Sequence, residues 1–158
     1  MTEYFMLKYL HVIGSTVLLG TGAGIAFFML MAHRTGDAAT VAATARIVVI
    51  ADFVFTATAV VAQPVTGVAL AWHVGYSLRE GWIMLSIALY VITGMFWLPV
   101  VWIQMQMRNL AEAAKAAGLP PPQRYSQLFR LWFAFGFPAF AAVVGIFWLM
   151  IARPTILW

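Results

Sequence analysis

The sequence predicts an all-α protein: a transmembrane four-helix bundle with up-down-up-down topology and both termini on the same, outer, side of the membrane. Of its 158 residues, 64% are hydrophobic and 9% are charged, a composition that excludes an ordinary soluble domain. Four runs of at least 22 residues contain no Asp, Glu, Lys or Arg. Since about 20 apolar residues cross the roughly 30 Å hydrocarbon layer as a helix, each run is long enough to span the membrane.

Turn and breaker residues divide the chain into helices over about residues 3–33, 37–73, 82–117 and 123–153, within one integral membrane domain, residues 1–158. Gly36 can end the first helix and Asp37 can cap the second. Gly118 and the run Pro120–Pro122 stop the third helix before the fourth begins. The tryptophans lie mostly near the expected helix ends and are interpreted as interfacial anchors. They are Trp72, Trp82, Trp97, Trp102, Trp132, Trp148 and Trp158.

Basic residues set the expected orientation. Six lie at the end where the first and third helices finish, namely Arg34, Arg46, Arg108, Lys115, Arg124 and Arg130. The other end carries three, which are Lys8, Arg79 and Arg153. By the positive-inside rule, the six mark the cytoplasmic side of the bacterial inner membrane. The net charge of +4 is scattered over helix ends and forms no patch, so no nucleic acid partner is expected.

The chain has no cysteine, which excludes disulfides, thiolate-bound zinc, iron–sulfur clusters and covalently attached haem. The sequence also contains no recognisable nucleophile elbow and no glycine-rich phosphate loop. Hydrolase and nucleotide-driven functions are therefore set aside.

Polar residues recur at helical spacing on the second and third helices and predict an intramembrane polar stripe on each. The second helix contributes Asp52, Thr56, Gln63 and Thr66, and the third contributes Ser86, Tyr90, Thr93, Trp97, Gln104 and Arg108. The stripes are expected to face each other, because polar groups that face lipid are costly. The hydroxyl and amide groups can form hydrogen bonds that hold neighbouring helices together. Asp52, within reach of Gln104 or Arg108, fits a structural pair and a proton-handling role equally well.

His11 and His73 are candidate axial ligands of haem iron. His11 lies two turns into the first helix and His73 closes the second at the same end, so an antiparallel hairpin brings them to similar depth. Two neutral imidazoles can ligate haem without any cysteine. Arg79, in the loop just beyond His73, could neutralise a haem propionate. Room for a porphyrin is expected beside the small residues Gly14, Ser15, Gly22, Ala69 and Gly75. The alternative is that both histidines lie at headgroup level without a ligand.

The segment Leu7–Ile13, followed by His33, resembles the first helix of the bacterial membrane protoporphyrinogen IX oxidases, small helical bundles that bind haem b. This resemblance implies that His11 is an axial haem ligand. The chain has no lysine between Glu80 and Arg108, where that family has a functional one. Three other strings resemble an uncharacterised family of predicted bacterial integral membrane proteins, which implies a fold but no activity. They are Trp97–Gln104, Phe129–Ala134 and Phe147–Met150.

Two functional hypotheses follow. The first is a haem b-binding redox protein of the bacterial inner membrane that passes electrons to or from a quinone or a partner protein. The alternative is a cofactor-free membrane protein, either an assembly subunit or a small-solute or proton pathway, that uses the polar stripes. The lipid bilayer is a partner under both hypotheses, and homo-oligomer formation stays open. His11 and His73 matter most under the first, and Asp52, Gln63 and Gln104 under the second.

Overall fold

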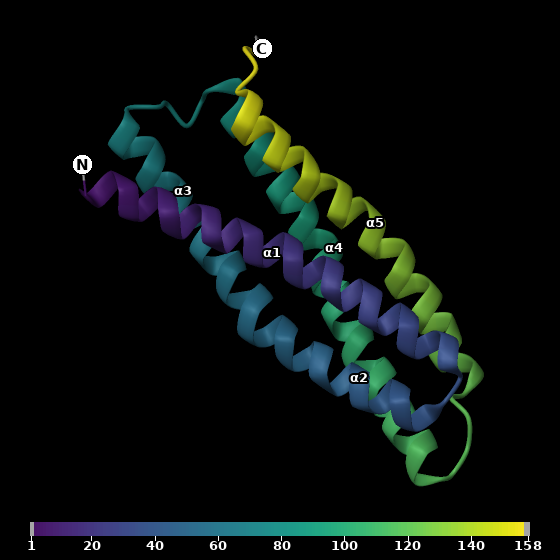
Figure 1. The fold of residues 1–158 in the computed structure, drawn as a ribbon. Helices are drawn as coiled ribbons and strands as arrows, with labels where there is room; N and C mark the ends of the chain where they lie inside the picture. Colours follow the sequence, from purple (N-terminus) through teal and green to yellow (C-terminus); the bar gives the residue numbers. More distant parts are fainter. Residues whose placement is uncertain (1, 157–158) are drawn as a thin grey trace.

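The computed structural model describes residues 2–156 as helices joined by short connections (Figure 1). The elements are α1 (Thr2–Thr35), α2 (Ala38–Ala51), the π-helical segment η1 (Asp52–Thr56), α3 (Ala57–Val74), α4 (Gly81–Ala116) and α5 (Gln123–Ala152). Because η1 joins α2 to α3 without a break, the described chain forms four helical rods, each long and apolar enough to cross a membrane. The predicted all-α, four-span architecture is confirmed, and the rods end within two residues of the expected positions.

Local sequence explains where the rods end. Gly36 adopts the left-handed conformation between α1 and α2, with φ of 66°, and Gly75 ends α3 with φ of 82°. The Asp37 carboxylate caps α2 by accepting hydrogen bonds from the Thr40 amide at 2.8 Å and the Thr40 hydroxyl at 2.6 Å. These bonds favour the charged form and lower the pKa of the Asp37 carboxyl below its ordinary value.

The bundle is packed most tightly at the end that holds the α1–α2 turn and the α4–α5 connection, called here the turn end (Figure 1). Side chains from α1, α2, α4 and α5 form one apolar cluster there. Five of its members have no exposed surface at all: Met29, Val41, Ala45, Met107 and Ala111. The small alanines of this cluster let the helix backbones approach closely, so packed side chains close this end of the bundle.

The opposite end, called here the termini end, holds both described chain ends and the α3–α4 connection (Figure 1). There the rods separate into two pairs, α1 with α3 and α4 with α5, and α3 and α4 diverge from each other (Figure 1). Large apolar side chains point outward along the rods, including Val61, Val65 and Met95, each at least 65% exposed. Such surfaces suit contact with lipid tails.

Candidate functional site around Asp52

A buried carboxylate lies at the point where the second rod departs from α-helical geometry. Asp52 begins η1, and its carbonyl oxygen accepts the amide of Ala57 five residues later, in place of the usual four. Asp52 is 4% exposed, and Thr56, in the same segment, is 6% exposed. The Thr56 hydroxyl has no hydrogen-bond partner within the described chain. Single π-helical turns are rare and often occur at functional sites.

Neutral N–H groups hold the Asp52 carboxylate in place. The Trp97 indole Nε1 donates to Oδ1 at 3.2 Å, and the Gln104 Nε2 donates to Oδ2 at 3.5 Å. The Trp132 indole Nε1 donates in turn to Gln104 Oε1 at 3.0 Å. Because an indole N–H can only donate, Trp132 fixes the orientation of the Gln104 amide with its Nε2 toward Asp52. The result is a chain of polar groups that crosses the bundle from α5 through α4 to η1.

No cation neutralises this carboxylate among the residues that the structure describes. Arg108, one turn beyond Gln104, instead donates its Nε and Nη2 to the Asn109 side-chain oxygen at 3.2 and 2.9 Å. Of the two partners expected for Asp52, the structure therefore supplies Gln104 and not Arg108.

The second rod turns its remaining polar residues toward α1. Gln63 donates its Nε2 to the carbonyl oxygen of His11 at 3.0 Å. That amide occupies the space over Gly14, where an added Cβ would lie 2.3 Å from Gln63 Nε2. Thr66 lies 2.8 Å from His11 Nδ1. Thr66 also donates its hydroxyl proton to a carbonyl of its own helix at 2.7 Å, so Thr66 accepts from His11 Nδ1–H and the proton of the imidazole lies on Nδ1.

The expected stripes of the second and third helices meet only in part. Tyr90 reaches across from α4 and donates to the carbonyl oxygen of Val60. Thr93 donates to the Leu89 carbonyl of its own helix, and Ser86 does the same toward Trp82. The expectation that the two stripes face each other along their whole length is therefore wrong. Asp52 faces α4, whereas Gln63 and Thr66 face α1.

The remaining candidates lie apart from this site. His73 is exposed and stacks on Tyr4, with ring centroids 5.9 Å apart, whereas His11 contacts Thr66 two turns away along the same rod. The structure thus gives the two histidines different partners and does not bring their rings together. Arg79 lies in the exposed α3–α4 connection. Residues 2–156 contain no cluster of three or more His, Asp or Glu that could hold a metal ion.

Two site residues differ from their sequence interpretation. Trp132, expected as an interfacial anchor, is 4% exposed inside the bundle, and Trp97 donates to Asp52 instead of only facing the interface. The expected stripe of the third helix includes Trp97, seven residues before Gln104 on the same helical face. No such signal singles out Trp132. Trp158 lies outside the described residues.

Comparison with known proteins supports the membrane architecture. No curated protein and no solved structure matches the chain. Over residues 5–154, the chain matches the family described as Predicted integral membrane protein (DUF2269). This match confirms the resemblance expected from the third and fourth helices, whereas the resemblance to protoporphyrinogen oxidases receives no such support. The chain belongs to this family of predicted integral membrane proteins, whose function is unknown.

Proposed function

We propose that this protein is a component of a proton pathway in the bacterial inner membrane, and that Asp52 is its proton-binding group. One observation carries the proposal: a carboxylate only 4% exposed, within a membrane-spanning rod, has neutral N–H groups as its hydrogen-bond partners. A purely structural ion pair would place a cation there. The more general alternative, passage of a small polar solute, would use the same residues.

Magnitudes favour a carboxyl group that can exchange its proton. An ionised carboxylate at mid-bilayer costs about 2.5–3.5 kcal/mol. Each hydrogen bond to a charged group returns about 1.5–3 kcal/mol. Asp52 accepts two such bonds, one of them long at 3.5 Å. The free-energy cost of the buried charge and the stabilisation from its hydrogen bonds are therefore similar. Neither protonation state is then strongly excluded, which is the condition for taking up and releasing a proton.

The surrounding polar groups indicate the direction of exchange. The turn end is filled by the buried cluster, whose Tyr125 hydroxyl has no hydrogen-bond partner within the described chain. Toward the termini end, polar groups follow one another along the second rod: the unpartnered Thr56 hydroxyl, the Tyr90 hydroxyl on Val60, then the Gln63 amide. We infer that Asp52 exchanges its proton toward the termini end, which we expect from the count of basic residues to lie outside the cell.

Proton flux in proteoliposomes tests the proposal. A potassium diffusion potential drives protons into vesicles that contain a pH-sensitive dye, and the rate of acidification is measured. Asp52→Asn retains the shape and an acceptor oxygen but cannot exchange a proton, so its flux should fall to that of protein-free vesicles. Glu112→Gln is the matched control, because Glu112 is an exposed carboxylate on α4, and its flux should equal that of the wild type. Equal flux in Asp52→Asn and wild type, at equal thermal stability, would overturn the proposal.

A second candidate function, haem b binding for electron transfer with a quinone or a partner protein, has one specific observation in its favour. The Nδ1–H of His11 is fixed on Thr66, which leaves the Nε2 lone pair as the ligating nitrogen. A second hydrogen bond that orients the ring is typical of histidines that bind metals. His11 would hold the iron, and bound haem would supply one-electron transfer.

The packing does not fit a porphyrin between His11 and His73. The Gln63 amide fills the space beside Gly14, and the His11 ring lies against Gly67, 3.2 Å from the position of an added Cβ. Oxidised and dithionite-reduced absorption spectra of the purified protein separate the possibilities. Under this candidate, His11→Ala loses the Soret band and His73→Ala keeps it. A flat spectrum in the wild type, expressed with haem supply, would exclude haem binding.

A further inference from the structure

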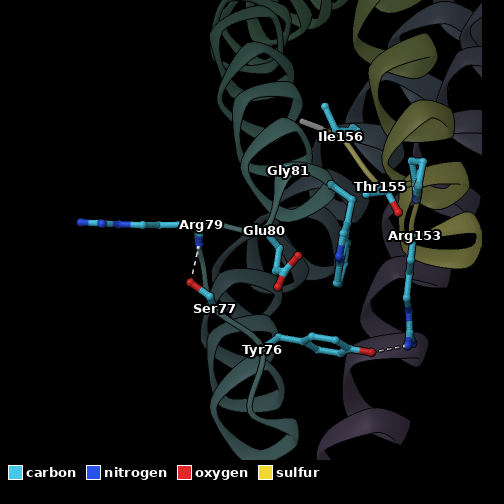
Figure 2. A pocket seen from close by; sticks show the side chains of 10 residues that line it. Tyr76, Ser77, Arg79, Glu80, Gly81, Arg153, Thr155 and Ile156 are labelled. Carbon is cyan, nitrogen blue, oxygen red and sulfur yellow. Dashed lines mark hydrogen bonds between the residues drawn. The ribbon is translucent and has the colours of Figure 1, made fainter. Parts of the chain in front are cut away.

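A pocket of about 470 Å³ lies at the termini end, between the α3–α4 connection and the segment that follows α5 (Figure 2). Tyr76, Glu80 and Trp82 line it from one side, and Arg153 and Thr155 from the other. The pocket is far along the bundle from Asp52 and does not depend on the function proposed above. It lies where the apolar spans of α4 and α5 begin and end, at the level of lipid headgroups.

Arg153 is held in this pocket by unusual backbone and aromatic contacts. It is the one non-glycine residue of the described chain with positive φ, at 43°. Its Nη1 donates to the Tyr76 hydroxyl at 2.9 Å, and its guanidinium lies over the rings of Tyr76 and Trp82, 5.6 and 5.8 Å from their centroids. Nη2 makes no hydrogen bond within the described chain. A guanidinium held on Tyr76 and Trp82 with a spare donor edge suits a phosphate or carboxylate group.

Glu80 supplies the opposite charge. It directly precedes α4, is exposed, and its side chain makes no capping hydrogen bond to that helix. Figure 2 shows the Glu80 carboxylate turned into the pocket, on the side opposite Arg153. Arg79 also borders the pocket, with its side chain extended outward (Figure 2). The pocket therefore presents an anion on one wall and a cation on the other.

We propose that this pocket binds a phosphoethanolamine group, with Arg153 on the phosphate and Glu80 on the ammonium. A ligand of purely negative charge would leave the Glu80 carboxylate without a partner. A choline group cannot donate hydrogen bonds to a carboxylate, and Arg153 already occupies the aromatic faces that would otherwise attract it. The group has two sources, the headgroup of phosphatidylethanolamine and soluble phosphoethanolamine. The position of the pocket at the level of the lipid headgroups favours the lipid.

Lipid binding to the full chain in detergent, measured by native mass spectrometry, tests this inference. Phosphatidylethanolamine should bind about tenfold more tightly than phosphatidylcholine or phosphatidylglycerol of the same chains, as expected for one charge-assisted hydrogen bond. Glu80→Gln should abolish this preference, and Arg153→Gln should weaken the binding of phosphatidylethanolamine itself. Lys8→Gln is the matched control and should leave both unchanged, because Lys8 is an exposed cation at the same end of the bundle that does not line the pocket.

Competition by the soluble group distinguishes the two sources, and the lipid preferences of the wild type and the variants test the inference itself. Competition by soluble phosphoethanolamine at similar concentration would assign the site to the soluble zwitterion, and its absence would assign it to the lipid. Equal binding of all three lipids by the wild type would overturn the inference. So would the loss of preference in Lys8→Gln, or its retention in Glu80→Gln, a variant that removes no capping hydrogen bond from α4.

Discussion

Replacing Gly14 with Ala should destabilise the bundle through one neighbour, Gln63. The added Cβ would lie 2.3 Å from Gln63 Nε2, so the amide has to move and its 3.0 Å bond to the His11 carbonyl is lost. Overpacking of this kind costs about 1–3 kcal/mol. The hydrogen bond adds about 0.6 kcal/mol in a membrane protein. Alanine recovers up to about 1 kcal/mol of helix propensity. The net expectation is a loss of about 1–3 kcal/mol.

Reversible unfolding in mixed micelles of mild detergent and dodecyl sulfate, followed by circular dichroism, measures this loss. Gly20→Ala is the control on the same helix, since nothing lies within 4 Å of its added Cβ, and it should be neutral or stabilising. In a Gln63→Ala background the obstructing amide is absent, so Gly14→Ala should no longer be costly. An equal loss in both backgrounds would refute the idea that Gln63 sets the approach of α1 and α3.

Two other predictions follow from single contacts. Trp132→Phe leaves the fully buried Gln104 oxygen without its donor and should lower the free energy of unfolding by about 1–3 kcal/mol, whereas Trp148→Phe, 59% exposed toward lipid, should change it little. Asp37 has a lowered pKa through its bonds from Thr40, so its contribution to stability is present above the ordinary value of 3.8 and disappears as the pH falls through the folded-state pKa. The difference in Tm between wild type and Asp37→Asn should therefore shrink on acidification below about pH 4, and a constant difference would contradict this assignment.

The helical architecture could be predicted from the sequence because its causes are local. Long charge-free runs require a helix in lipid, and glycine and proline fix the ends of the rods. Gly36, Gly75 and Gly118 all adopt positive φ in the connections between rods. The π-helical segment at Asp52 could not be predicted in this way, since no composition or spacing distinguishes five π-helical residues from α-helical ones.

That segment also explains why the site was predicted only in part. A continuous α-helix would keep Asp52, Gln63 and Thr66 on one face. One extra residue in a turn rotates everything beyond it by about 100°. Asp52 consequently faces Gln104 on α4, as expected, while Gln63 and Thr66 face α1. Trp132 donates to Gln104 because of the way α5 is rotated against α4. The sequence of α5 does not specify that rotation.

The unequal packing of the bundle has a mechanical consequence. The α1–α3 and α4–α5 pairs extend from the tightly packed turn end over about 20 residues, or about 30 Å each. A rotation of one pair by about 5° about the turn end moves its far end by about 2.6 Å. Because rods adjust their tilt to the thickness of the surrounding bilayer, we expect the angle between the two pairs to depend on that thickness. The α3–α4 connection and the hydrogen bond from Arg153 to Tyr76 join the two pairs at that far end, so such a movement has to be accommodated there.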